Sequence, residues 1–234
     1  MSDPLVLIPG MMCDARLFGP QVAALSHGRA ILAAPLLGAT VGEIAQGVLE
    51  AAPPRFALAG LSMGGIVAME VLRRAPGRVT RLGLMDTNAR AESAEVAARR
   101  EPQIAAVREG RLEAVMRDEM KPNYLAPGAG REPVLDLVME MALAQGAAAF
   151  ERQSRALQSR PDQREALRGW PGPALVLCGR HDALCPVFRH EEIAGLLPGA
   201  ELVVVEDAGH LPTLEAPEAV NAAMADWLAR PAQE

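Results

Sequence analysis

Short apolar runs alternate with longer amphipathic stretches along most of this chain. The largely apolar runs cover 5–8, 30–34, 56–59, 79–85, 173–178 and 202–205. Runs of this length that are apolar on both faces are typical of buried strands in a parallel sheet. The stretches between them have helical periodicity, which is expected of crossover helices. The pattern predicts an α/β fold with a doubly wound, mostly parallel sheet of about six strands.

Residues 88–170 depart from this alternation. Helical periodicity continues over 96–109, 112–120, 133–145 and 147–158, and no strand-like run interrupts it. Extra crossover helices would explain the pattern too, but a connection between parallel strands rarely needs so many residues. We therefore expect a helical cap insertion over 88–170 and an α/β core formed by 1–87 and 171–234.

The stretch Gly60-Leu61-Ser62-Met63-Gly64-Gly65 lies between a predicted strand and a predicted helix. A serine flanked by glycines two residues away on each side, in a sharp strand-to-helix turn, is the pattern of a nucleophile elbow. Side chains at Gly60 and Gly64 would collide in so tight a turn. A glycine-rich turn with an incidental serine is the alternative, and the strand–helix context favours a nucleophile.

A serine nucleophile needs a base, and the chain has four histidines. His210 follows the last predicted strand in a glycine-containing loop, from which it can reach across the strand ends. His27 lies at a predicted helix end, His181 belongs to a local turn, and His190 lies in a polar helical stretch where we expect it to be solvated. These positions favour His210 as the base for Ser62.

The base in turn needs a carboxylate that orients it. Asp182 follows the next-to-last predicted strand, and Asp86 follows the strand after the elbow. Asp182 could instead cap the helix that begins near Pro186, a common use of aspartate. Chain order favours Asp182 as the acid and leaves Asp86 as the competing candidate.

Three motifs together resemble the α/β-hydrolase fold superfamily, and its small esterase, enol-lactonase and C–C hydrolase branch in particular. They are the elbow at 60–65, Gly179-Arg180-His181-Asp182 with Pro186, and Gly209-His210 with Glu215-Ala216-Pro217-Glu218. The order Ser62, Asp182, His210 is that of the family. Two features differ: Pro9-Gly10 stands where the family has His-Gly, and we expect the family's leading antiparallel hairpin to be absent.

The resemblance implies a site in which backbone N–H groups of Met11 and Met63 form the oxyanion hole. An apolar pocket for the substrate would be formed by Met12, Leu61, Met116, Met120 and Tyr124. Each of these five side chains could equally be ordinary core packing. Methionine adapts to ligands of varied shape, which favours the pocket.

Composition narrows the partners and the location. The net charge of −6 argues against nucleic acid and anionic membranes as partners. No apolar run approaches the roughly 20 residues of a membrane span, and the N-terminus lacks the basic region of a signal peptide. The three cysteines have no metal-ligand spacing and are expected to be free thiols. We expect a cytoplasmic protein that acts on a small molecule without cofactor or metal.

These observations predict a serine hydrolase that cleaves a carboxylic ester or lactone of a small, largely apolar substrate through an acyl-enzyme. A C–C bond hydrolase or a cofactor-free perhydrolase with the same triad is an alternative. A non-catalytic, ligand-binding member of the fold is an alternative of another class.

Overall fold

The computed structural model describes residues 3–128 and 130–232. Its centre is a six-stranded sheet in which every neighbouring pair of strands is parallel, in the order β2-β1-β3-β4-β5-β6. The strands are β1 (Leu5–Ile8), β2 (Ile31–Ala33), β3 (Phe56–Leu61), β4 (Val79–Met85), β5 (Ala174–Gly179) and β6 (Ala200–Val205). The predicted sheet is thus confirmed, strand by strand.

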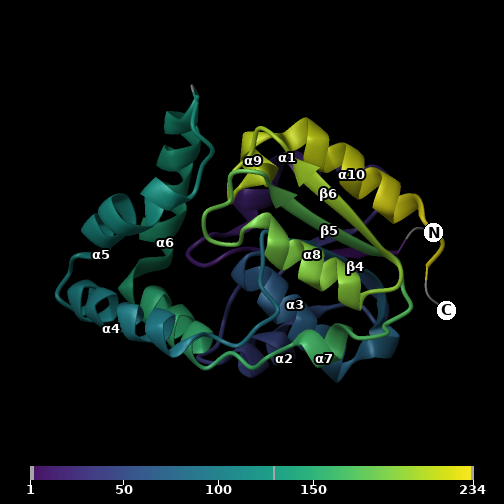
Figure 1. Ribbon diagram of the computed structural model, residues 1–234, viewed down its shortest axis with the longest axis horizontal. Helices are drawn as coiled ribbons and strands as arrows, with labels where there is room; N and C mark the ends of the chain where they lie inside the picture. Colours follow the sequence, from purple (N-terminus) through teal and green to yellow (C-terminus); the bar gives the residue numbers. More distant parts are fainter. Residues whose placement is uncertain (1–2, 129, 233–234) are drawn as a thin grey trace.

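Burial explains why the inner strands are apolar on both faces. All residues of β1, β3, β4 and β5 are buried, whereas the edge strands β2 and β6 are mostly half-buried. The alternating connections place helices on both sides of the sheet, as Figure 1 shows. Those that cover the sheet are α1 (Gly19–Leu25), α2 (Val41–Ala51), α3 (Met63–Arg74), α8 (Val187–Leu196) and α10 (Pro217–Ala229).

Reciprocal hydrogen bonds between side chains and backbone mark the start of α2. The hydroxyl of Thr40 accepts a hydrogen bond from the N–H of Glu43 at 3.1 Å. The carboxylate of Glu43 reaches back and accepts from the N–H of Ala39 at 2.8 Å. This reciprocal arrangement satisfies free N–H groups at the helix start.

Helices dominate the segment between β4 and β5. They are α4 (Ala94–Arg108), α5 (Leu112–Ala114), the π-helix η3 (Val115–Met120), the short 3-10 helix η4 (Lys121–Asn123), α6 (Arg131–Gln158) and α7 (Arg164–Leu167). Figure 1 shows α4, α5 and α6 grouped beyond the ends to which the strands point. In contrast, α7 packs against α3 and α8, so the end of the segment 88–170 lies with the helices that cover the sheet.

The long helix α6 consists of two helical stretches that are separated at Gly146. Gly146 has φ 78° and ψ 175°, which breaks the helical backbone between the two stretches predicted on either side of it. By length and composition alone α6 is apolar enough to span a membrane, which the sequence had not indicated. This is weak evidence for a membrane protein, because core helices meet the same criterion, and α6 packs against α4.

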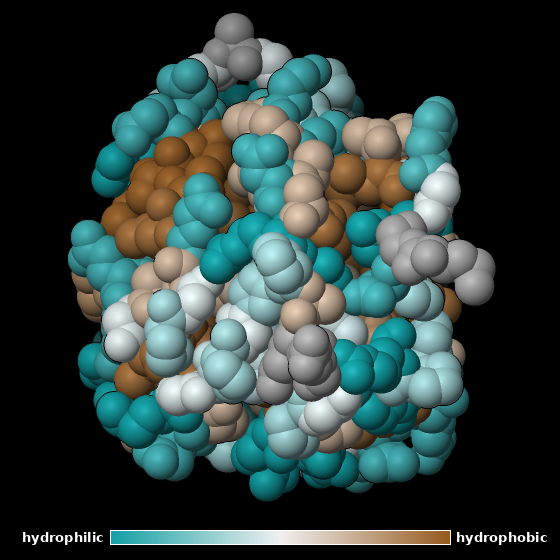
Figure 2. Space-filling view, turned by 90° about the vertical axis from the view of Figure 1, so that its right-hand side faces the viewer, coloured by the Kyte–Doolittle hydropathy of each residue, from teal (hydrophilic) through white to brown (hydrophobic). Residues whose placement is uncertain are grey.

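The remaining short helices are η1 (Ala15–Phe18), η2 (Pro76–Arg78) and α9 (Pro212–Glu215). Helices α9 and α10 follow β6, and α10 also packs against α1. The face that carries the chain ends, away from α4–α6, mixes hydrophilic side chains with apolar areas (Figure 2).

Candidate active site

Ser62 lies in the turn between β3 and α3 with a φ of 55°, which is unusual for a residue other than glycine. A Cβ on Gly60 would overlap the carbonyl of Gly64, and one on Gly64 would overlap the carbonyl of Ile8. The turn is braced by Thr87, whose hydroxyl donates a hydrogen bond to the Ser62 carbonyl at 2.7 Å. The geometry of a nucleophile elbow, with its strained serine backbone, is therefore present.

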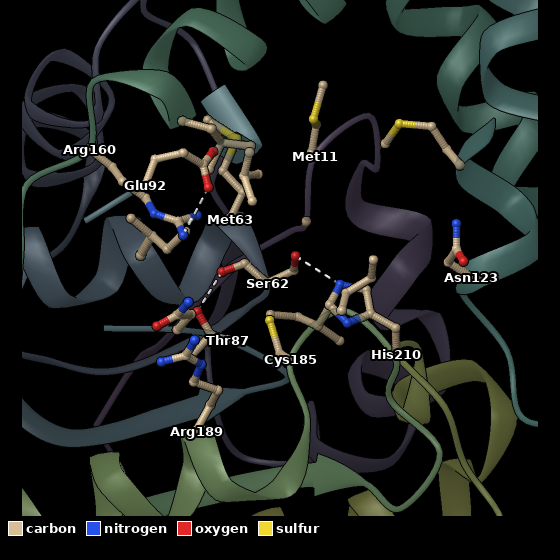
Figure 3. Close-up of a pocket in the computed structure, with 18 of the residues that line it drawn as sticks. Met11, Ser62, Met63, Thr87, Glu92, Asn123, Arg160, Cys185, Arg189 and His210 are labelled. Atoms are coloured by element: carbon tan, nitrogen blue, oxygen red, sulfur yellow. Dashed lines mark hydrogen bonds and ion pairs between the residues drawn. The ribbon is translucent and has the colours of Figure 1, made fainter. Parts of the chain in front are cut away.

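His210 and Asp182 meet Ser62 in one hydrogen-bonded line (Figure 3 shows Ser62 and His210). His210 Nε2 lies 2.9 Å from Ser62 Oγ. His210 Nδ1 lies 2.8 Å from Asp182 Oδ2. His210 and Asp182 are buried, at 3% and 4% exposure, so their interaction is shielded from solvent.

The carboxylate of Asp182 is held by more than the imidazole. Its Oδ1 accepts hydrogen bonds from the N–H groups of Leu184 and Cys185 at 2.8 and 2.9 Å. Burial by itself would raise the pKa of Asp182, but His210 and these two N–H groups keep the pKa below its usual value. The helix-capping alternative for Asp182 is wrong, because the N-cap of α8 is Pro186 and no side chain of the described residues caps that helix. One oxygen of Asp182 instead holds the local turn before α8, while the other faces His210.

The loop that carries His210 is organised by a second carboxylate. Glu215 accepts hydrogen bonds from the N–H groups of Ala126, Gly209 and Leu211 at 2.8 to 3.0 Å. The N–H of His210 donates to the carbonyl of Tyr124 at 2.6 Å, and the two rings stack with centroids 6.0 Å apart. Residues of the inserted segment therefore help to fix the position of the imidazole.

The competing acid, Asp86, lies beside this line without a contact to His210. Its Oδ1 accepts from the N–H of Gly179 at 2.9 Å, and it is completely buried. Burial, together with the nearby carboxylate of Asp182, raises the pKa of Asp86 well above its usual value. Both effects favour the neutral, protonated form of Asp86 over the carboxylate.

The expectation that His190 is solvated is wrong. Its side chain is fully buried under the β4 end, where Nε2 accepts a hydrogen bond from the N–H of Thr87 at 2.9 Å. Burial lowers the pKa of His190 to about 4, so the ring is neutral at physiological pH. A polar sequence neighbourhood on α8 concealed this, because His190 occupies the inward face of the helix.

The two predicted oxyanion donors face the same space. Met11 and Met63 both line the pocket above Ser62, and neither backbone N–H has an acceptor within the described ranges. The next N–H, that of Met12, donates to Gln153 Oε1 at 2.8 Å. Gln145 in turn donates to the carbonyl of Cys13 at 2.6 Å. Two glutamines of α6 thus hold the loop in which Pro9-Gly10 replaces the usual His-Gly, a support the sequence pattern did not indicate.

The pocket has a volume of about 590 Å³ and lies between the strand ends and the inserted helices. Of the predicted lining residues, Leu61, Met120 and Tyr124 line it. Met12 and Met116 are fully buried in the core and do not, so the prediction for these two is wrong. The lining is also less apolar than expected, because arginines from α4, α8 and the end of α6 contribute to it.

Comparison with known proteins agrees with this geometry. The model of the alpha/beta hydrolase family matches residues 5–223. The chain belongs to the α/β hydrolase family.

Among curated relatives, this α/β hydrolase is 28% identical over 248 residues to the dihydrolipoyllysine-residue acetyltransferase component of the acetoin cleaving system of Pseudomonas putida. That match covers 97% of this chain and 64% of the relative. It is 30% identical over 195 residues to the pimeloyl-[acyl-carrier protein] methyl ester esterase of Aromatoleum aromaticum, covering 79% of this chain and 78% of the relative. A solved thermophilic esterase from Thermogutta terrifontis superimposes with a TM-score of 0.88 at 27% identity, covering 97% and 90% of the two chains.

A cysteine lies close to the hydrogen-bonded line of this α/β hydrolase. Ligand atoms of Asp182, Cys185 and His210 lie within 4.8 Å of one another, a spacing that a metal ion would accept. Both ring nitrogens of His210 are already hydrogen-bonded. Burial and the charge of Asp182 raise the pKa of Cys185 well above its usual value, so it stays a neutral thiol. The donor set is therefore better suited to proton transfer than to metal binding.

Proposed function

We propose that this α/β hydrolase is a serine hydrolase that cleaves a carboxylic ester or lactone of a small molecule through an acyl-enzyme. The observation that carries the proposal is the hydrogen-bonded line from Ser62 Oγ through His210 to Asp182 at 2.9 and 2.8 Å. A serine hydroxyl is a weak nucleophile unless a base accepts its proton as it attacks. His210 Nε2 is the basic atom within hydrogen-bond distance of Oγ.

Each group in the proposed mechanism has a defined role. Ser62 Oγ attacks the acyl carbon while His210 Nε2 takes the proton. Asp182 holds the proton on Nδ1 and stabilises the imidazolium that forms. His210 then gives the proton to the leaving alcohol. Water then attacks the acyl carbon as it loses a proton to His210, and His210 returns that proton to Ser62 Oγ when the bond to the acyl group breaks and the acid leaves.

Charge on the reacting oxygen is stabilised by the N–H groups of Met11 and Met63. Both residues line the pocket, and neither N–H has another acceptor in the described part of the chain. Met63 is also the first residue of α3, whose N-terminal partial positive charge favours an oxyanion there. An oxyanion donor of this kind accounts for a rate factor of about 10² to 10³ in serine hydrolases.

The proposal also covers the substrate size, the cofactor requirement, the location and the cap. The substrate is a small molecule, because the volume of about 590 Å³ suits one of moderate size. No step of the mechanism needs a metal or a cofactor. The cytoplasm is the proposed location, in keeping with three free thiols. The inserted segment 88–170, through its helices α4 to α6, forms the cap that covers the substrate.

The proposal is tested by hydrolysis of 4-nitrophenyl acetate and by labelling with a fluorophosphonate probe. Ser62→Ala should lower kcat by about 10³-fold or more and abolish labelling. Ser26→Ala, which removes an exposed hydroxyl, is the matched control. Turnover by Ser62→Ala close to that of the unaltered chain would refute the proposal. A folded, unaltered chain with neither turnover nor labelling would instead indicate a non-catalytic, ligand-binding member of the family.

A further inference from the structure

Three arginines line one side of the pocket, and two of them share a single carboxylate. We call Arg100, Arg160 and Arg189 the arginine cluster; all three line the pocket, and the carboxylate is that of Glu92. They come from α4, from the residues just after α6, and from α8. Figure 3 shows Glu92, Arg160 and Arg189 around the same space as Ser62.

Glu92 is fully engaged by two of the three arginines. Its Oε2 accepts from Arg100 Nε at 2.8 Å, and its Oε1 pairs with Arg160 Nη2 at 3.0 Å. The Glu92 side chain is only 3% exposed and that of Arg160 only 10%. Arg189 has no carboxylate within ion-pair distance in the described ranges, and its guanidinium lies 4.9 Å from the ring centre of Phe188. The cluster therefore has more positive than negative charge.

An excess of buried positive charge is unfavourable without a counter-ion. Burial lowers the pKa of Arg160, and the charges of Arg100 and Arg189 lower it further, despite Glu92. Unpaired guanidinium groups in a pocket are suited to planar, two-oxygen anions, which they bind through parallel N–H donors. The arginine cluster is thus complete only when an anion joins it.

The other charged groups around the pocket do not supply that anion. Arg90 is paired with Glu192. Arg99 is paired with Glu95 on the surface of α4. The remaining acid of the lining, Glu119, is exposed and accepts from the Gln103 amide at 3.0 Å. The excess positive charge around the pocket therefore lies in the arginine cluster, and no carboxylate of the described lining residues balances it.

The position of the cluster indicates which part of a substrate would reach it. In Figure 3, His210 lies on one side of Ser62, whereas Glu92, Arg160 and Arg189 lie on the other. In the proposed mechanism His210 protonates the leaving alcohol, so the alcohol lies on the histidine side. The acyl chain then extends toward the arginines. Arg100 also contacts Met11, whose Sδ lies 3.9 Å from Arg100 Nη1, next to the proposed oxyanion donor.

We propose that the arginine cluster binds a carboxylate at the far end of the acyl chain, so that the preferred substrates are monoesters, or the corresponding lactones, of dicarboxylic acids. This rests on the proposed function, and it names the class of substrate for the same site. The chain between the two carboxyl carbons lies along the apolar part of the pocket, and the free carboxylate pairs with Arg189 and its neighbours.

Binding is measured first, because it does not require Ser62 to be a nucleophile. Adipate is titrated by calorimetry into the Ser62→Ala protein, with and without Arg189→Met. One lost charge-assisted contact should weaken adipate binding by about 10- to 100-fold. Arg189→Lys should bind adipate more tightly than Arg189→Met, because lysine keeps the positive charge but lacks the parallel N–H donors of the guanidinium. Arg168→Met, on α7 and paired with Glu165, removes the same charge at the surface and is the control.

Hydrolysis is measured second, on monomethyl adipate and methyl heptanoate, in which an ethyl group replaces the carboxylate. The ratio of kcat/KM for the two esters should favour monomethyl adipate and should fall by about 10- to 100-fold in Arg189→Met. Inorganic phosphate is titrated in parallel. Tighter binding of phosphate than of adipate would overturn the assignment to a carboxylate.

The two arms separate the two proposals. Adipate binding that depends on Arg189, in a protein without esterase activity, would support the carboxylate site and refute the proposed function. Esterase activity that depends on Ser62, with no adipate binding and no preference for the charged ester, would refute the carboxylate site and leave the proposed function standing. An equal loss in Arg168→Met and Arg189→Met would also overturn the site, since the effect would then be one of net charge.

Discussion

Replacing Asp182 by asparagine tests the proposed mechanism at its most specific point. The two N–H groups of Leu184 and Cys185 donate to Oδ1 at 2.8 and 2.9 Å, and an asparagine would keep its carbonyl oxygen there. Its NH2 group would then face His210 Nδ1, in the position that Oδ2 occupies at 2.8 Å. The amide donates where the carboxylate accepts, so Nδ1 has to become an acceptor.

That change moves the imidazole proton to Nε2, which lies 2.9 Å from Ser62 Oγ. A protonated Nε2 has no lone pair with which to take the serine proton. The imidazolium that forms in the reaction also loses its negative partner. We expect kcat to fall by about 10⁴-fold, which corresponds to about 5 kcal/mol of transition-state stabilisation.

The assay is hydrolysis of 4-nitrophenyl acetate, with the thermal unfolding midpoint as the check on folding. Asp86→Asn is the matched control. Burial favours the protonated form of Asp86, which an amide resembles in shape, and the oxygen of the amide can still accept from the N–H of Gly179. The control should lose about tenfold or less, the size of one neutral hydrogen bond. A larger loss in Asp86→Asn than in Asp182→Asn would refute the reasoning and move the acid to Asp86.

Two further predictions concern stability. Burial lowers the pKa of His190 from 6.5 to about 4. Between these two pH values the unfolded chain binds a proton at His190 and the folded chain does not. The free energy of unfolding should therefore fall by roughly 3 kcal/mol as the pH drops from 6.5 to 4. His190→Gln keeps an acceptor for the Thr87 N–H but cannot titrate, so urea unfolding should show a shallower pH dependence; an unchanged slope would contradict the assignment. Gly64→Ala should cost about 3 kcal/mol or more, because its Cβ would overlap the backbone of Ile8. Gly47→Ala, in the open on α2, should instead gain about 0.5–1 kcal/mol, and similar effects at both sites would argue against a tight elbow.

Local patterns were enough to predict the strands and most helices. The sheet has the predicted strands because runs such as 56–61 are buried on both faces, and only apolar side chains tolerate that. The helix that starts after Thr40 has its signal within four residues. The break at Gly146 needs only the residue itself, since a positive φ favours glycine.

The elbow could also be predicted from the sequence, because its sharp turn leaves no room for a Cβ at Gly60 and Gly64. The pattern did not reveal the support for that turn, in which Thr87, just after the end of β4, donates a hydrogen bond to the Ser62 carbonyl. Chain order led to Ser62, Asp182 and His210, and the fold brings these three within hydrogen-bond distance. Their catalytic roles remain predictions for the variants above.

Only the tertiary structure decided which polar side chains are buried and what they meet. The polar neighbours of His190 in the sequence suggest that it is solvated, but it lies on the inward face of α8 and is buried in the core. Gln153 on α6 holds the N–H of Met12 across 141 positions of sequence. Arg100, Arg160 and Arg189 lie on separate segments, and nothing in their spacing predicts that all three line one pocket and that two of them pair with Glu92. Sequence periodicity records which face of an element avoids water, whereas the partners of a polar group depend on how whole elements pack.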